Sequence, residues 1–268
     1  MSRVITALIA LPILIASILL EPLKLLFVII AFAAMVIALY EFWHLGRKKT
    51  VKADVVIGYG AAVALFVGFY FPGGMLLLPV ILPLFVVAVI VAATWRGAPF
   101  DSMMSSVGLT VLGVLYVVML GGHLVAVRTY FPQKLSAHLL SYFFLVIMGS
   151  DTGAYYTGRA FGRHKLAPAI SPGKTWEGAI GGMAASLAMA ALAHFWFFPE
   201  LGLLTAIGLA ASMNILGVLG DLSESAFKRG AGAKDAAKIL PGHGGLLDRL
   251  DSLLFNAPLI YYFASFYF

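Results

Sequence analysis

Apolar stretches of about 20 residues, separated by short polar or Pro- and Gly-rich breaks, recur along this 268-residue chain. A helix of that length crosses the hydrocarbon layer of a bilayer and satisfies its own backbone hydrogen bonds there. The pattern therefore predicts an all-α, polytopic integral membrane protein with about nine transmembrane helices. We expect these near residues 4–20, 22–43, 54–72, 74–94, 103–125, 137–158, 176–198, 201–220 and 250–267, with ends defined to about four residues.

Composition supports lipid as the solvent of this chain. Hydrophobic residues make up 62% and charged residues 11%, whereas a soluble domain carries about 25% charged residues. Cysteine is absent, which excludes disulfides, zinc–thiolate sites and a catalytic thiol. The first apolar stretch also resembles a cleaved signal peptide, but no clear small-x-small cleavage site follows it. We therefore expect a retained helix.

The distribution of positive charge predicts the orientation. Nine spans place the termini on opposite sides, and all but three of the 18 Lys and Arg then lie on the side of the N-terminus. Such a bias is typical of cytoplasmic loops. We expect a cytoplasmic N-terminus, an inner-membrane location and an active site that faces the cytoplasm. Because short loops account for the basic residues, we expect no nucleic-acid partner.

The two halves of the chain differ in chemistry. Residues 221–251 alone hold ten of the 30 charged side chains. We expect residues 1–135 to form a transmembrane scaffold or lipid-binding wall of about five helices. Residues 136–268 then form a catalytic region of about four helices.

The first polar cluster ends the stretch 201–220. On a helix, Asp221, Glu224, Ser225 and Lys228 recur at i, i+3, i+4 and i+7 and share one face. Carboxylates at membrane depth are costly and mark functional sites. The alternative is that the two acids pair with Lys228 and Arg229 at the membrane interface.

The second cluster is "LPGHGGLLDRLD". Its glycines, among them Gly244 and Gly245, bring backbone N–H groups close to a ligand around His243, a favourable site for phosphate oxygens. Asp248 and Asp251 follow at i and i+3; the alternative is that they only oppose the helix dipole. Together with Asp221 they predict a Mg²⁺ site, because a hard cation prefers carboxylate oxygens and shares its shell with substrate phosphates.

The third cluster spans residues 149–178. Asp151 lies well inside the stretch 137–158, where an ionisable group indicates a functional site; the alternative is a structural pair with a buried Arg or Lys. A cationic rim for a lipid head group or nucleotide phosphates follows: Arg159, Arg163, His164, Lys165 and Lys174. For Arg163 and Lys165, ordinary positive-inside charge is an equal alternative.

Residues 225–251, "SAFKRGAGAKDAAKILPGHGGLLDRLD", resemble the signature of the phosphatidate cytidylyltransferases (CDP-diacylglycerol synthases) with no departure at any position. The segment "SDTGAYYTGRAFGRHKLAPAISPGKTWEG" resembles the second hallmark of that family. The resemblance covers about residues 149–256 in motif detail. Over the first 140 residues it consists of hydropathy alone.

The resemblance implies that phosphatidic acid and CTP give CDP-diacylglycerol and pyrophosphate, with Mg²⁺ and a second cation, either K⁺ or Mg²⁺. It implies Asp221 and Asp248 as the main metal carboxylates, with Asp251 and Asp151 close by, and membrane lipids and a second copy of the chain as partners. Two other classes share some of these features. A polyprenyl-phosphate transferase would use the same carboxylates and basic rim, and a transporter would show two related halves.

The complete set of expected site residues has two parts. The catalytic set is Asp221, Lys228, Arg229, His243, Asp248 and Asp251, with Asp221, Asp248 and Asp251 as metal ligands and His243 as an orienting group rather than an obligatory base. The substrate- and phosphate-binding set is Asp151, Lys174, Ser225, Lys234, Lys238, Gly244, Gly245 and Arg249.

Overall fold

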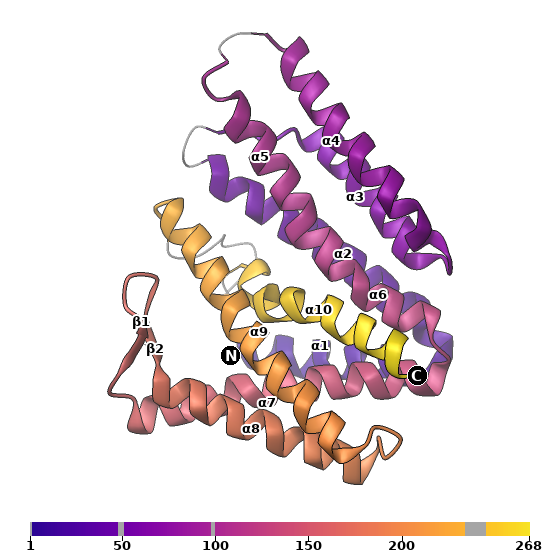
Figure 1. Ribbon diagram of the computed structural model, residues 1–268, viewed down its shortest axis with the longest axis vertical. Helices are drawn as coiled ribbons and strands as arrows, with labels where there is room; N and C mark the ends of the chain where they lie inside the picture. The colour runs from indigo at the N-terminus through magenta and orange to yellow at the C-terminus, as the bar shows by residue number, and fades with distance from the viewer. Residues whose placement is uncertain (1, 48–50, 98–99, 234–244) are drawn as a thin grey trace.

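The computed structural model describes residues 2–47, 51–97, 100–233 and 245–268 (Figure 1). The α-helices are α1 Ser2–Leu19, α2 Lys24–Arg47, α3 Val55–Tyr70, α4 Leu78–Trp95, α5 Met103–Gly113, α6 Leu120–Tyr130, α7 Gln133–Phe161, α8 Trp176–Trp196, α9 Leu203–Gly230 and α10 Leu247–Tyr267. Short 3₁₀ turns, Glu21–Leu23 and Gly74–Leu77, precede α2 and α4, and a π-helical turn, Val114–Met119, joins α5 to α6. Two strands, β1 Lys165–Ala167 and β2 Ser171–Thr175, form a hairpin before α8.

Several of these helices are long and apolar enough to cross a membrane. Among the described residues six segments qualify: Glu21–Gly46, Gly74–Trp95, Met103–Tyr130, Gln133–Phe161, Trp176–Trp196 and Leu203–Gly230. Two shorter apolar helices are Ala10–Leu19 and Val55–Tyr70. Helix α10 is not in this set, because polar residues such as Asp251 and Asn256 interrupt its apolar sequence. The chain is thus an integral membrane protein with several candidate spans, and the count of nine and the orientation stay predictions.

Two elements differ from the expectation. Helix α9 continues to Gly230, beyond the expected end at 220. Lys228 pairs with Glu224, one turn earlier, at 2.5 Å, and this pair stabilises the polar last turns of α9 as a helix. The expected all-α fold included no strand, whereas residues 165–175 form the β1–β2 hairpin, in which Lys165 faces Thr175. Thr175 ends the hairpin and caps α8, where its hydroxyl accepts the N–H of Gly178 at 3.1 Å.

Buried side chains form two clusters that meet at α10. The first gathers residues of α2, α3, α4, the π turn and α6, including Trp43 and Phe69. The second gathers mainly residues of α7, α8 and α9, including Phe143. Helix α10 contributes Leu254 to the first cluster and Ile260 to the second, so it connects the two halves of the chain. The division at residue 135 concerns function and stays a prediction.

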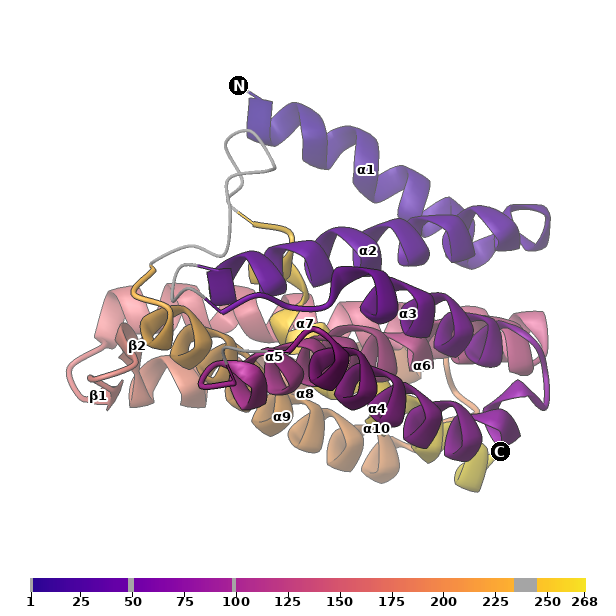
Figure 2. The same ribbon diagram turned by 90° about the horizontal axis from the view of Figure 1, so that it is seen from above.

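Small residues bring α7 and α8 close together. A Cβ added at Gly153 would lie 2.8 Å from the carbonyl oxygen of Gly181 and would also clash with Ala185. Such small-residue contacts are a common way for membrane helices to approach each other. The two helices run side by side, with the hairpin at one end of the pair (Figures 1 and 2). Residues of this pair line the cavity of the candidate active site.

Candidate active site

A cavity of about 520 Å³ lies between α7, α8, α9, α10 and the hairpin. Its volume is in the range of small-molecule binding sites. The residues that line it on α7 are Val146, Ile147, Ser150, Asp151, Ala154, Tyr155, Gly158 and Arg159, and those on the hairpin and α8 are Leu166, Gly173, Lys174, Thr175, Gly178 and Ala179. Helices α9 and α10 add Met213, Asn214, Gly217, Val218, Asp221, Asp248, Arg249, Asp251 and Ser252.

Four carboxylates from three helices line this cavity. Asp151 comes from α7, Asp221 from α9, and Asp248 and Asp251 from the first two turns of α10. Three of the expected phosphate-binding or rim cations line it as well: Arg159, Lys174 and Arg249. The structure thus brings together acids and bases that lie up to 100 residues apart in the sequence.

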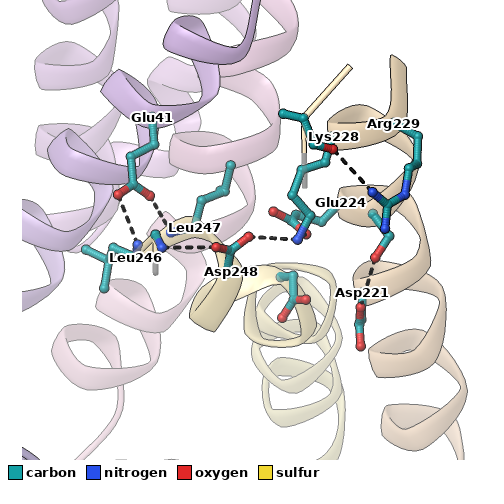
Figure 3. A network of polar contacts seen from close by, with 12 residues as sticks. Glu41, Asp221, Glu224, Lys228, Arg229, Leu246, Leu247 and Asp248 are labelled. Carbon is teal, nitrogen blue, oxygen red and sulfur yellow. Dashed lines mark hydrogen bonds and ion pairs between the residues drawn. The ribbon is translucent and has the colours of Figure 1, made fainter. Parts of the chain in front are cut away.

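Lysines contact two of these carboxylates directly. Lys174 Nζ lies 2.6 Å from Asp221 Oδ2, and the Ser225 hydroxyl donates to Asp221 Oδ1 at 3.4 Å. Lys228 Nζ lies 2.7 Å from Asp248 Oδ1 and 2.5 Å from Glu224 Oε2 (Figure 3). Glu224 is fully buried, and a buried carboxylate is costly unless it is paired. Lys228 therefore compensates two acids at once.

The remaining expected residues fall into two groups. Arg229 donates to the backbone oxygens of Ile170 and Ala233, at 3.2 and 3.4 Å, and so ties the end of α9 to the hairpin. The Gly245 N–H donates to Asp248 Oδ2 at 3.0 Å. Four expected residues lie outside the described residues: Lys234, Lys238, His243 and Gly244.

The alternative of simple interfacial ion pairs holds only in part. Lys228 pairs with Glu224 as that alternative expected, but its second partner is Asp248 from another helix, and the partner of Asp221 is Lys174 from the hairpin. On the cationic rim, Arg163, His164 and Lys165 are exposed and are not among the lining residues.

Two polar features of this region were missed from the sequence. The Asn214 amide donates to the Ser150 hydroxyl at 2.6 Å across the α7–α9 contact, and both side chains are buried. An Asn in the middle of an apolar helix is the signal that would have indicated this pair. Glu41 on α2 contacts the start of α10. Its place at the end of an apolar stretch gave no sign of that contact.

The donor atoms at the cavity suit a hard cation. Among the described residues, no three His, Cys, Asp or Glu are grouped closely enough to hold a metal ion by themselves. Mg²⁺ is usually held by only one or two carboxylates, and waters and substrate phosphates complete its shell. Asp151, Asp221, Asp248 and Asp251 line one cavity and supply such carboxylate oxygens. The oxygen donors present therefore fit a Mg²⁺ ion that the substrate helps to bind.

Three relatives of this chain carry the same name. The chain is 47% identical over 132 residues to a phosphatidate cytidylyltransferase of Haemophilus influenzae, which covers 48% of this chain and 46% of the relative. It is 49% identical over 123 residues to the protein of that name in Staphylococcus haemolyticus. This match covers 46% of this chain and 47% of the relative. It is 48% identical over 124 residues to the protein of that name in Staphylococcus aureus (strain COL). This match covers 46% of this chain and 47% of the relative. The chain thus spans about half the length of each relative that it matches.

A wider match defines the family. Residues 1–267 match the group described as the cytidylyltransferase family, so the likeness extends through the N-terminal helices as well as the cavity-lining segments. On this match the chain belongs to the cytidylyltransferase family.

Proposed function

We propose that this chain transfers the cytidylyl group of CTP to phosphatidic acid, which yields CDP-diacylglycerol and pyrophosphate. The name of the relatives supports this reaction. The observation that carries it is a single cavity, bounded by apolar helices, in which four aspartates and three cationic side chains converge. A site for two phosphorylated substrates and a metal ion, one of them a lipid, needs these features.

In this reaction an oxygen of the lipid phosphate attacks the α-phosphorus of CTP, and the bond to the departing pyrophosphate breaks. Two anions must approach, and negative charge builds up on the leaving group. Arg159, Lys174 and Arg249 offset that charge from the cavity wall. A phosphate monoester is already largely ionised near neutral pH, with a second pKa of about 6, so no general base on the protein is required. His243 then orients phosphate or a carboxylate.

Asp221 and Asp248, with Asp251 nearby, are the proposed Mg²⁺ ligands, and a second cation, K⁺ or Mg²⁺, shares the site. A bound Mg²⁺ would neutralise phosphate charge and align the two substrates. The chain's own contribution is to hold these three carboxylates, from α9 and α10, at one cavity. Lys228, which contacts Asp248 at 2.7 Å, fixes that carboxylate in place.

The cavity has an ionic end and an apolar end. On α7 its lining runs from Val146 to Arg159, a rise of about 20 Å along a helix. Arg159 and the hairpin form the ionic end, whereas Val146, Ile147 and Met213 line the other. We place the nucleotide at the ionic end and the glycerol and acyl chains of the lipid at the apolar end. The Ser150–Asn214 pair then faces the ester carbonyls of the lipid.

The proposal includes the setting of the enzyme. The excess of Lys and Arg in alternate loops supports nine spans, a cytoplasmic N-terminus and an active site open to the cytoplasm at the inner membrane. CTP then reaches the ionic end of the cavity from water, and phosphatidic acid enters from the bilayer. A homodimer is part of the same proposal, on the basis of the family resemblance.

The test is a product assay with the full chain in lipid nanodiscs. Radiolabelled CTP and Mg²⁺ are supplied with phosphatidic acid, with polyprenyl phosphate, or with neither. We expect a lipid-extractable labelled product with phosphatidic acid alone, its loss on addition of EDTA, and its return with excess Mg²⁺. Labelled lipid from polyprenyl phosphate alone would assign the chain to that transferase class instead. Uptake of solute into sealed vesicles without any labelled lipid would identify a transporter.

A further inference from the structure

A carboxylate from the N-terminal half of the chain contacts the start of α10. Glu41 lies on α2 and is completely buried. Its Oε1 accepts the N–H of Leu246 at 3.0 Å, and its Oε2 accepts the N–H of Leu247 at 2.7 Å. Figure 3 shows Glu41 pointing from α2 into the first turn of α10. The contact joins residues more than 200 positions apart.

Helix α10 needs such a partner. The first N–H groups of an α-helix have no acceptor within the helix, and a Ser, Thr, Asp or Asn at the N-cap usually supplies one. The N-cap of α10 is Leu246, whose side chain cannot accept a hydrogen bond. Glu41 therefore supplies from another helix the cap that the sequence of α10 lacks. The positive end of the helix dipole in turn stabilises the buried carboxylate.

The same turn of α10 carries the cavity aspartates. Asp248 follows Leu247 directly, and its two oxygens contact the Gly245 N–H and Lys228 Nζ. Asp251 lies one turn further on and is also buried at the cavity. Glu41 itself is not among the cavity-lining residues, so it has no direct access to a substrate there. Because both hydrogen bonds of Glu41 go to the start of α10, we expect its effect on the reaction to pass through that helix.

We propose that Glu41 is a positioning residue that fixes where α10 begins, and thereby the place of Asp248 and Asp251 at the metal site. The N-terminal helices then act on the chemistry and do not serve as a wall alone. The part that concerns catalysis rests on the proposed function. The part that concerns the start of α10 rests only on the two hydrogen bonds.

The experiment compares Glu41→Gln and Glu41→Asp with wild type and with Asp54→Asn. Glutamine keeps the size of Glu41 but turns an NH₂ donor toward one of the two N–H groups, and aspartate is too short to reach both. Asp54 is the matched control, because it caps α3 in the same half of the chain: its Oδ1 accepts the N–H of Ile57 at 3.3 Å. The measurements are backbone hydrogen exchange, the Mg²⁺ concentration for half-maximal activity, and kcat.

We expect Glu41→Gln to increase amide exchange at the start of α10 at least tenfold relative to the remaining helices. The Mg²⁺ requirement should rise about tenfold, and kcat should fall roughly 10²-fold, the loss that follows when reacting groups shift by about 1 Å. Glu41→Asp should lie between Glu41→Gln and wild type. Asp54→Asn should change neither α10 exchange nor the Mg²⁺ requirement.

Two results would overturn this proposal. One is unchanged exchange at the start of α10 in Glu41→Gln. The other is a general increase in exchange with an unaltered Mg²⁺ requirement, which would make Glu41 a stabilising residue only. If wild type produced no CDP-diacylglycerol, the proposed function would fail, while the exchange measurement would still decide whether Glu41 fixes the start of α10.

Discussion

Lys174 offers the sharpest test of the proposed site, because removal of its charge should move two constants in opposite directions. In the structure Lys174 Nζ contacts Asp221 Oδ2 at 2.6 Å. In the proposed reaction the same lysine binds phosphate and Asp221 binds Mg²⁺. Lys174→Ala therefore removes a cation that competes with Mg²⁺ for Asp221, and it also removes a partner of the nucleotide.

The size of both effects follows from the ion pair. A hydrogen bond between charged groups contributes about 1.5–3 kcal/mol. The side chains of Lys174 and Asp221 are 23% and 39% exposed, so solvent screening favours the lower end of that range. A free energy of about 1.5 kcal/mol corresponds to roughly a tenfold change in a binding constant. We expect the KM for CTP to rise about tenfold and the Mg²⁺ concentration for half-maximal activity to fall about tenfold.

The assay is the formation of labelled CDP-diacylglycerol in nanodiscs, with CTP and Mg²⁺ varied independently. Lys134→Ala is the matched control, because Lys134 Nζ contacts Glu200 Oε1 at the same 2.6 Å but neither residue lines the cavity. This control should change neither constant. A Lys174→Ala variant with a higher Mg²⁺ requirement, or with an unchanged KM for CTP, would refute the reasoning.

Three further predictions concern the metal, the lipid and the packing. Asp248→Asn should lower kcat at least 10²-fold in a protein that still inserts and folds, with the exposed Asp101→Asn as control; near-wild-type turnover would remove Asp248 from the metal shell. Asn214→Ala should raise the KM for phosphatidic acid about fivefold, because one hydrogen bond contributes about 1 kcal/mol to binding. The KM for an ether-linked analogue, which lacks the ester carbonyls, should not change. Ser212→Ala, an exposed hydroxyl on the same helix, is its control, and equal losses with both lipids would contradict the ester contact. Gly153→Ala should destabilise the protein by about 1–3 kcal/mol through overpacking, measured by thermal unfolding, whereas Gly208→Ala, which meets nothing within 4 Å, should not.

Helix positions were largely predictable because apolar length is a strong signal. The expected stretch 176–198 corresponds to α8, Trp176–Trp196, and 103–125 corresponds to the start of the continuous segment Met103–Tyr130. The apolar stretch ends at residue 220, before the charged residues begin, so hydropathy predicted an end of α9 that is ten residues earlier than the observed one at Gly230. The hairpin was not predictable, because its pairing depends on contacts outside its own sequence, such as Glu177 accepting the N–H groups of Arg163 and His164.

The site was predictable in composition but not in pairing. Helical periodicity places Asp221, Glu224 and Lys228 on one face of α9, which predicted a functional site and left ion pairs at the membrane interface as the alternative. It gave no information about the partner helix, so the contacts of Lys228 with Asp248 and of Lys174 with Asp221 were unexpected. The contact of Glu41 with the start of α10 could not be predicted for the same reason, because sequence periodicity does not reveal which helix end a distant carboxylate will cap.

These pairs suit a site that must hold substrates of high negative charge. A carboxylate in such a place is costly when alone, and Lys174 and Lys228 offset that cost before any substrate arrives. On the proposed function, Asp221 would exchange Lys174 for a bound Mg²⁺, and Lys174 would exchange Asp221 for a substrate phosphate. Each charge would keep a partner of opposite sign in this exchange. Lys228 differs, because the buried Glu224 holds it at 2.5 Å, and it therefore stays with Asp248 and keeps that carboxylate in place at the cavity.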